Sequence, residues 1–300
     1  MRPDIRGDLH SLRPLVELDR RGFVTTALAG GFAAATLPIS ATAISTDLAG
    51  LEAGEARLPA ADGPLPAYFA RPAVGQNLPV VLVIQEIFGV HEHIRDVCRR
   101  FAKRGALAIA PELFARQGNP ATVADLQVLM RDIVAKVPDA QVMSDLDATL
   151  RWARTARGTG KVGITGFCWG GRITWLYAAH SSEVAAGVAW YGRLVGQPSE
   201  LQPRHPVDVA AALRAPVLGL YAGRDRGIPL DTVERMRSAL TAADVSAAAR
   251  ASAINVFPEA EHGFYADYRA SFRREDAEPA FRSALAWFTR AGVALTEPPG

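Results

Sequence analysis

A cysteine in a glycine-rich turn is the residue of this sequence best suited to covalent chemistry. The apolar segment 161–165 (KVGIT) leads directly into residues 166–171 (GFCWGG), and a helical pattern follows. Glycines two positions before and after Cys168 leave room for a sharp turn that exposes the sulfur. The dipole at the start of the helix would stabilise a thiolate. The spacing therefore predicts that Cys168 is a nucleophile, and the alternative is a buried structural cysteine.

A thiol nucleophile needs a base, and two later loops supply a carboxylate and a histidine. Asp225 follows the apolar segment 216–221, and His262 follows the segment 254–257. Nucleophile, acid and then histidine is the chain order of the α/β-hydrolase triad, so Asp225 would orient His262 as the base. A helix-capping Asp225 and a surface-loop His262 are the alternatives. The other candidates are Glu259, Glu261 and Asp231 for the acid, and His91, His93, His180 and His205 for the base.

The elements that would position these residues alternate along the chain. Short apolar runs without polar alternation indicate strands that are buried on both faces of a parallel sheet. A weakly alternating segment over 56–70 predicts an antiparallel hairpin before them. The alternation predicts a doubly wound, mostly parallel α/β sheet with helices on both faces and its working loops at the carboxyl ends of the strands. The predicted strands are 79–85, 106–110, 161–165, 184–191, 216–221 and 254–257, and the predicted helices 91–104, 122–135, 139–157, 171–180, 230–243 and 275–291.

The first 43 residues resemble a bacterial export signal. Arg20 and Arg21 precede an apolar run over 23–39, and residues 41–43 (ATA) form a small-x-small cleavage site. The arginine pair resembles the twin-arginine class, which implies export of the folded protein through that machinery. We therefore expect a signal peptide over 1–43, one domain over 44–300 and a periplasmic location. Membrane tethering by an uncleaved segment is the alternative, although the run is short for a spanning helix.

Charge and cysteine content exclude several other classes of protein. Lys and Arg number 33 against 31 Asp and Glu, for a net charge of +2, so a polybasic nucleic-acid binder is not expected. Cys98 and Cys168 cannot form a disulfide framework, and Cys98 lies on the apolar face of a helical pattern, where an inert thiol is expected. The sequence has no H-x-x-E-H or H-E-x-x-H motif, no C-x-x-C and no phosphate loop, so neither a metal nor a nucleotide cofactor is implied.

Four blocks of sequence together resemble the dienelactone hydrolase, or carboxymethylenebutenolidase, family. They are residues 85–90 (QEIFGV), 111–117 (PELFARQ) and 166–171 (GFCWGG), and the loops that carry Asp225 and His262. The resemblance extends over about residues 55–290. It implies an α/β-hydrolase fold, a Cys168 nucleophile and, as substrate, a carboxylated dienelactone.

The resemblance also implies roles for residues around the nucleophile. Glu86 matches a glutamate that controls the protonation of the thiol, so that the thiolate forms only when substrate binds. A buried carboxylate beside a thiol makes a second negative charge costly, which fits this role. Backbone N–H groups of Ile87 and Trp169 would form the oxyanion hole. The alternative for Glu86 is an ordinary carboxylate at a strand end.

The substrate-binding arginines agree with the family only in part. Arg116 matches the arginine that binds the substrate's carboxylate, for which a guanidinium fork is suited, and a solvated loop arginine is the alternative. The family's second arginine, four residues after the catalytic histidine, is replaced by Ala266, while Tyr268 and Arg269 lie nearby but out of register. Arg193 is the candidate replacement cation. Phe88, Trp169, Tyr191, Phe264 and Tyr265 are candidates for an apolar pocket wall, or for the core.

The sequence therefore predicts an exported, cofactor-free hydrolase that cleaves a lactone or carboxylic ester through an acyl-thioester at Cys168. A broad carboxylesterase, or another lactonase acting on neutral substrates, is the nearest alternative. A thiol redox protein is a more distant one, because a reactive cysteine without a resolving partner argues against it. A non-catalytic ligand-binding relative is the third alternative.

Overall fold

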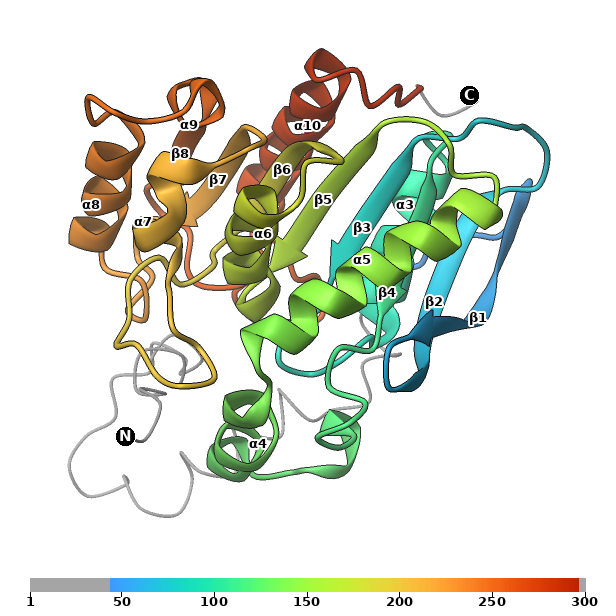
Figure 1. Ribbon diagram of the computed structural model, residues 1–300, viewed down its shortest axis with the longest axis horizontal. Helices are drawn as coiled ribbons and strands as arrows, with labels where there is room; N and C mark the ends of the chain where they lie inside the picture. The colour runs from blue at the N-terminus through green and yellow to red at the C-terminus, as the bar shows by residue number, and fades with distance from the viewer. Residues whose placement is uncertain (1–43, 297–300) are drawn as a thin grey trace.

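An eight-stranded sheet in the order β1-β2-β4-β3-β5-β6-β7-β8 forms the centre of the molecule (Figure 1). The computed structural model describes residues 44–296, so the export signal predicted over 1–43 lies outside the described residues. β1 pairs antiparallel with β2 and β2 with β4, whereas all other neighbouring strands are parallel. The strands are β1 Leu51–Ala60, β2 Gly63–Pro72, β3 Val80–Ile84, β4 Leu107–Pro111, β5 Val162–Phe167, β6 Val184–Trp190, β7 Val217–Ala222 and β8 Ala253–Phe257.

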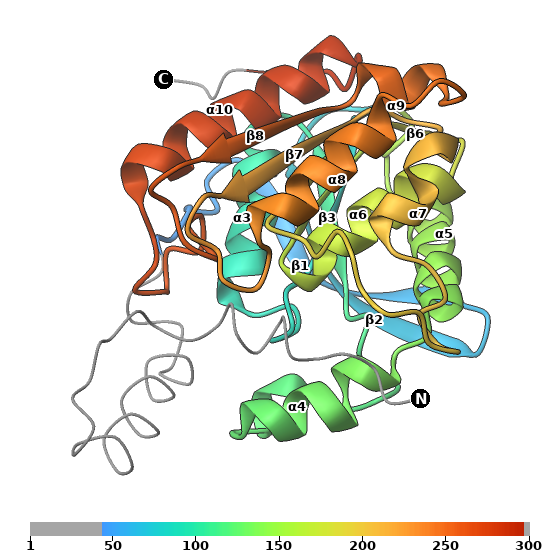
Figure 2. The same cartoon turned by 90° about the vertical axis from the view of Figure 1, so that its left-hand side faces the viewer.

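Helices cover both faces of this sheet, which confirms the predicted α/β-hydrolase fold. In Figure 2, α3 and α10 lie on one face, and α5, α6 and α8 lie on the other. No helix within residues 44–296 is long and apolar enough to cross a membrane. The helices are α3 Glu92–Ala102, α4 Leu126–Asp132, α5 Asp139–Thr155, α6 Trp169–His180, α7 Pro206–Val209, α8 Leu230–Leu240, α9 Ala247–Ala251 and α10 Arg274–Arg290, with 3₁₀ turns at Pro120–Thr122, Val134–Lys136 and Ala210–Ala212.

The central strands form the core because their sequences are apolar on both faces. Every residue of β3, β4, β5 and β7 is buried, as the unbroken apolar runs predicted. The predicted hairpin is also present, but its strands are longer than expected. Ala60 pairs with Gly63, so the turn consists of Ala61 and Asp62.

The predicted helix over 122–135 is wrong in its length. A 3₁₀ turn ends at Thr122, and α4 begins only at Leu126. The cause is local, since the carboxylate of Asp125 accepts hydrogen bonds from the N–H groups of Gln127 and Val128 and caps the helix there. The short helices α7 and α9 were not predicted, because four or five residues carry no helical periodicity.

Candidate active site

Cys168 lies at the sharp turn between β5 and α6, with φ 54° and ψ −115°. A positive φ is unusual outside glycine and stores backbone strain. The glycines beside it are required, because a Cβ on Gly166 would lie 2.1 Å from the carbonyl oxygen of Gly170, and a Cβ on Gly170 would lie 2.5 Å from that of Gln85. The turn therefore fixes the cysteine at the N-terminus of α6, where the helix dipole favours a thiolate.

His262 and Asp225 form a buried hydrogen-bonded pair in the loops that follow β8 and β7. His262 Nδ1 lies 2.7 Å from Asp225 Oδ2. The other carboxylate oxygen of Asp225 accepts from the N–H groups of Gly227 at 2.9 Å and Ile228 at 3.2 Å, which fixes its orientation. An ionised carboxylate only accepts hydrogen bonds, so Nδ1 is the protonated nitrogen of this pair. Nε2 of His262 is buried and has no hydrogen-bond partner among the described residues.

Two opposing effects act on the pKa of His262. Burial disfavours the imidazolium, but the Asp225 carboxylate and the nearby Cys168 thiol outweigh it and raise the pKa from 6.5 to about 10. The influence of Cys168 means that its sulfur lies close to the His262 ring. The ends of β5, β7 and β8 thus bring together the three residues predicted as a triad, and their catalytic roles remain predictions.

The Glu86 side chain is fully buried just beyond the end of β3. Its Oε2 accepts a short hydrogen bond from the Tyr268 hydroxyl, and His91 Nε2 lies 3.4 Å from the same oxygen. Oε1 lies 3.7 Å from Arg269 Nη2. Burial disfavours the carboxylate, but Arg269 and then His91 outweigh it and hold the pKa of Glu86 well below its usual range. Glu86 is therefore charged, with a positive side chain beside it.

Arg269 is the site residue that the sequence analysis set aside. Its guanidinium lies over the rings of Phe88 and Tyr268, each at 5.4 Å, and Nε donates to the Tyr268 hydroxyl at 3.2 Å. Counting positions from the histidine missed it because the loop folds into successive turns, in which Ala266 N–H bonds Gly263 O and Arg269 N–H bonds Ala266 O. An arginine close to the expected position was the available signal.

Several buried side-chain atoms in this region have no hydrogen-bond partner among the described residues. Buried polar atoms normally have a partner, so a group of them indicates a place where a polar ligand binds. Two of these atoms, on tryptophan and arginine, can only donate, which suits an acceptor-rich molecule. They are Glu86 Oε1, Trp169 Nε1, Tyr191 Oη, His262 Nε2 and Arg269 Nη2.

The remaining residues predicted for the site lie in the loops that follow β3 and β6. Tyr191 is buried at the end of β6, and its ring centroid lies 5.1 Å from that of His262 and 5.6 Å from that of Phe264. Ile87 is buried in the turn after β3, beside the backbone that meets the glycines of the elbow. Arg193 is half-buried in the loop after β6, where it acts on His205: burial, then Arg172 and Arg193, lower the pKa of that histidine.

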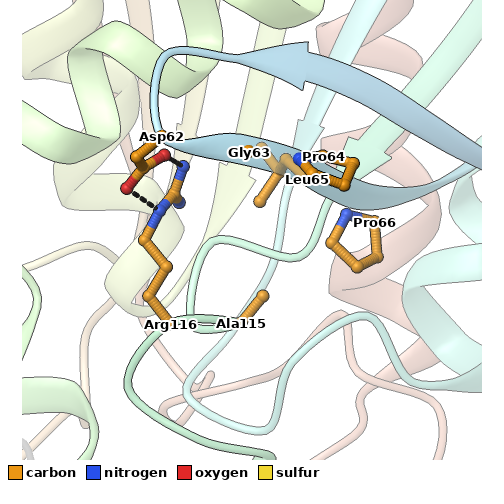
Figure 3. Close-up of a pocket in the computed structure, with 7 residues that line it drawn as sticks. All are labelled: Asp62, Gly63, Pro64, Leu65, Pro66, Ala115 and Arg116. Carbon is orange, nitrogen blue, oxygen red and sulfur yellow. Dashed lines mark hydrogen bonds and ion pairs between the residues drawn. The ribbon is translucent and has the colours of Figure 1, made fainter.

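Arg116 already binds two carboxylates of the protein. Its guanidinium bonds Asp62 in the β1–β2 turn, and Nη1 donates to Asp145 of α5 at 2.8 Å. Figure 3 shows the side chain at a small pocket lined by the hairpin and by Ala115, with the guanidinium against Asp62. Asp62 and Asp145 thus occupy the Arg116 guanidinium. The contact of Arg116 with a substrate carboxylate stays a prediction.

Two further predictions concern cysteines and metals. Both cysteines are free, as expected. Cys98 is buried, as predicted, and burial raises its pKa well above its usual range. Cys168 is also buried, at 4% exposed, whereas the turn was expected to expose its sulfur. Within residues 44–296, no group of three or more His, Cys, Asp or Glu side chains is arranged to hold a metal ion.

A strained turn that carries Cys168, and a His–Asp pair, at the carboxyl ends of a doubly wound sheet are typical of the α/β-hydrolase class. Comparison of the sequence then identifies the family, because residues 65–292 match the Dienelactone hydrolase family. The chain belongs to this family and is a dienelactone hydrolase-like hydrolase of lactones or esters.

Several known proteins are similar over most of the chain. A protein of Methylorubrum extorquens named "Putative carboxymethylenebutenolidase" is 56% identical over 96% of this chain and 98% of its own length. A protein of Salmonella typhi with the same name is 51% identical over 90% and 98%. The crystal structure of a "Putative Dienelactone Hydrolase" from Klebsiella pneumoniae is 54% identical, with a TM-score of 0.77, and covers 80% of this chain and 99% of that one.

Proposed function

We propose that this protein hydrolyses its lactone or ester through a Cys168–His262–Asp225 triad. The observation that carries the proposal is the buried 2.7 Å His262–Asp225 pair, whose unbonded Nε2 belongs to a ring that lies close to the thiol of the elbow. In this mechanism the Cys168 thiol gives its proton to Glu86, while a pKa of about 10 keeps His262 protonated on both nitrogens. The Cys168 sulfur attacks the carbonyl carbon, and backbone N–H groups of Ile87 and Trp169 stabilise the oxyanion.

The carbon–oxygen bond then breaks and leaves an acyl-thioester on Cys168. His262 Nε2 gives its proton to the departing oxygen, which in a lactone stays attached to the acyl group as an enol or alcohol. Water attacks the thioester carbon while His262 takes one of its protons. The carbon–sulfur bond breaks, the sulfur takes its proton back from Glu86, and the carboxylic acid leaves. Asp225 stabilises the imidazolium at both stages by accepting from Nδ1.

Glu86 would control when the thiolate forms. Its buried carboxylate places a negative charge beside the nucleophile, and Arg269 compensates that charge in the free enzyme. Both the Glu86 carboxylate and the Cys168 thiol act on Tyr191, which supports their belonging to one site. A substrate anion that draws on Arg269 would leave Glu86 freer to accept the thiol proton.

An anionic substrate is the form that this site favours. The Arg269 guanidinium is a cation beside Glu86, and its Nη2 has no hydrogen-bond partner within residues 44–296. A carboxylate could take two of its N–H groups. The aromatic rings of Phe88, Tyr191 and Phe264 would enclose the unsaturated part of a dienelactone. Arg116 is the second candidate for the carboxylate, since it matches the family arginine.

The test compares hydrolysis of a cis-dienelactone with hydrolysis of a neutral p-nitrophenyl ester. Cys168→Ala should abolish both activities, whereas Cys98→Ala should retain them and serves as the matched control, because that thiol is buried in α3. Mass spectrometry of the quenched wild-type enzyme should detect an acyl adduct on the peptide that contains Cys168. Full activity of Cys168→Ala would overturn the mechanism. Turnover of the neutral ester alone would keep the triad and remove the anionic substrate.

We also propose that residues 1–43 direct export to the periplasm. The support is the arginine pair before an apolar run and a small-x-small site. Cell fractionation of the full chain should recover the protein in the periplasm, with a new N-terminus at Ile44. Replacing Arg20 and Arg21 by lysines should retain it in the cytoplasm. Equal fractionation of both forms would contradict a twin-arginine signal.

A further inference from the structure

His91 lies against the Glu86 carboxylate, although the proposed mechanism gives it no role. Its Nε2 lies 3.4 Å from Glu86 Oε2, and its side chain is 8% exposed. Neither ring nitrogen has a well-formed hydrogen bond to any described residue. A buried imidazole normally pairs its N–H group, and Glu86 is the nearby acceptor. The Glu86 oxygen is thus the natural partner of the ring.

Packing holds the His91 ring in this position. The ring centroid lies 4.9 Å from that of Tyr268 in an edge-on contact, and 6.3 Å from that of Phe88. His93 stacks on its other side at 6.1 Å. The backbone is extended at φ −77° and ψ 178° because His91 is the residue that precedes α3. Little freedom is left to the ring except a small rotation about its own axis.

The two oxygens of Glu86 face different partners. Oε2 receives the Tyr268 hydroxyl and faces His91 Nε2, whereas Oε1 faces Arg269 and has no hydrogen bond. If Oε2 is held from two sides, Oε1 alone remains for a mobile proton or for the arginine. His91 can therefore act on Glu86 through Oε2 without blocking Oε1.

We propose that His91 is a positioning residue that donates its Nε2–H to Glu86 Oε2. Together with Tyr268 it keeps this carboxylate charged and turned so that Oε1 meets Arg269 and the thiol region. A small ring rotation shortens the 3.4 Å contact to an ordinary hydrogen bond. The inference deepens the proposed function and rests on it, because Glu86 matters only if Cys168 is the nucleophile.

The charges around this pair keep His91 a neutral donor. Burial lowers the pKa of His91, with Glu86 opposing and with His93 and Arg269 reinforcing the effect. The charged and titratable groups that act on the pair come from the loop after β8, from α3 and from the end of β6. They are Tyr268, Arg269, His93 and Tyr191.

The experiment compares the effect of losing the N–H donor of His91 with the effect of losing its aromatic ring. His91→Phe keeps an aromatic ring against Tyr268 but removes the donor, whereas His91→Gln keeps an N–H donor at about the reach of Nε2 and does not titrate. His180→Phe is the matched control, because that histidine is exposed and pairs with Asp147 away from Glu86. The readout is kcat against pH on the dienelactone, because kcat reports the groups of the enzyme–substrate complex, in which the substrate anion has drawn on Arg269.

Loss of a hydrogen bond to a charged group should move the acid limb of this profile upward by about one pH unit in His91→Phe. His91→Gln should restore the wild-type limb. In a Glu86→Gln background, His91→Phe should cause no further shift, since the carboxylate it acts on is gone. Equal profiles for His91→Phe and wild type, or an unchanged shift in the Glu86→Gln background, would overturn the proposal.

Thermal unfolding does not depend on the role of Cys168. It therefore distinguishes failure of the His91 proposal from failure of the proposed function. The depressed pKa of Glu86 adds stability above its ordinary pKa near 4.5, and this is lost as pH falls through the lower value in the fold. His91→Phe raises that lower value, so at pH 7 it should unfold at a lower temperature than His91→Gln. This difference should vanish in a Glu86→Gln background, where no carboxylate remains for the donor to stabilise. An equal difference with and without the Glu86 carboxylate would contradict a bond to Glu86, even if Cys168→Ala stayed active.

Discussion

Replacing Arg269 by methionine tests which arginine recognises the substrate's anionic group. The side chain of Glu86 is fully buried, and Arg269 Nη2 lies 3.7 Å from it. At an effective dielectric constant of about 20, unit charges at this distance attract each other by about 4 kcal/mol. Without the arginine, the pKa of Glu86 should rise by up to about three units. In the proposed mechanism this change lets Glu86 accept the thiol proton without a substrate anion, so Arg269→Met should hydrolyse the neutral ester at least as fast as the wild type.

The anionic substrate should lose more than the neutral one. A hydrogen bond between charged groups contributes about 1.5–3 kcal/mol, so the ratio of kcat/KM for the dienelactone to that for the p-nitrophenyl ester should fall by roughly 10- to 150-fold. The neutral ester is the reference in this ratio, because it has no carboxylate for Arg269 to bind.

Arg116→Met is the control, since Arg116 bonds Asp62 and Asp145 rather than Glu86. It should leave the ratio unchanged and lower stability by about 1–3 kcal/mol, because Asp145 is 2% exposed and loses its cation. Steady-state kinetics on both substrates and urea unfolding measure these effects. A fall in the ratio with Arg116→Met alone would refute the assignment to Arg269 and restore the family's arginine.

Two further predictions concern the histidine pair and the elbow. Asp225→Asn should lower kcat by about 10³- to 10⁴-fold, as loss of the orienting carboxylate does in other triads. The raised pKa of His262 adds stability that is complete below pH 6.5 and lost as pH rises through about 10, so Asp225→Asn should destabilise the protein in urea more at pH 6 than above pH 10. Gly166→Ala should cost at least about 3 kcal/mol, because its Cβ would meet the Gly170 carbonyl at 2.1 Å. Gly54→Ala has no atom within 4 Å and should melt like wild type, and equal melting of both alanine variants would contradict this account.

The fold and the elbow could be predicted because local sequence determines them. Unbroken apolar runs predicted the buried strands, and the glycines around Cys168 follow from the space that its turn allows. The loops with Asp225 and His262 were found because each directly follows a strand of the sheet. These signals all lie within a few residues of the feature that they specify.

The environment of Glu86 could not be predicted because its partners lie far along the chain. Tyr268 is 182 residues away, and no spacing rule connects the two. Arg269 depends on the turns of its loop, which a count of positions from His262 ignores. Arg116 shows the reverse case: its sequence block resembles a carboxylate binder, but the carboxylates it meets are those of Asp62 and Asp145.

Backbone strain on both sides of the His262 ring indicates that the site is shaped before substrate arrives. Besides Cys168, Tyr191 at the end of the neighbouring strand has a positive φ of 36°, and its ring meets that of His262 at 5.1 Å. Strain of about 1–3 kcal/mol per residue persists only where the surroundings enforce it. The backbones that follow these two residues are in close contact, because a Cβ on Gly192 would lie 2.3 Å from the carbonyl carbon of Gly171, and a Cβ on Gly171 would lie 2.8 Å from Cα of Gly192. This contact lies three residues after Cys168 and directly after Tyr191. It therefore restricts how the Cys168 thiol and the Tyr191 ring can move relative to each other. A site that is fixed before substrate binds is the preorganisation that electrostatic catalysis requires.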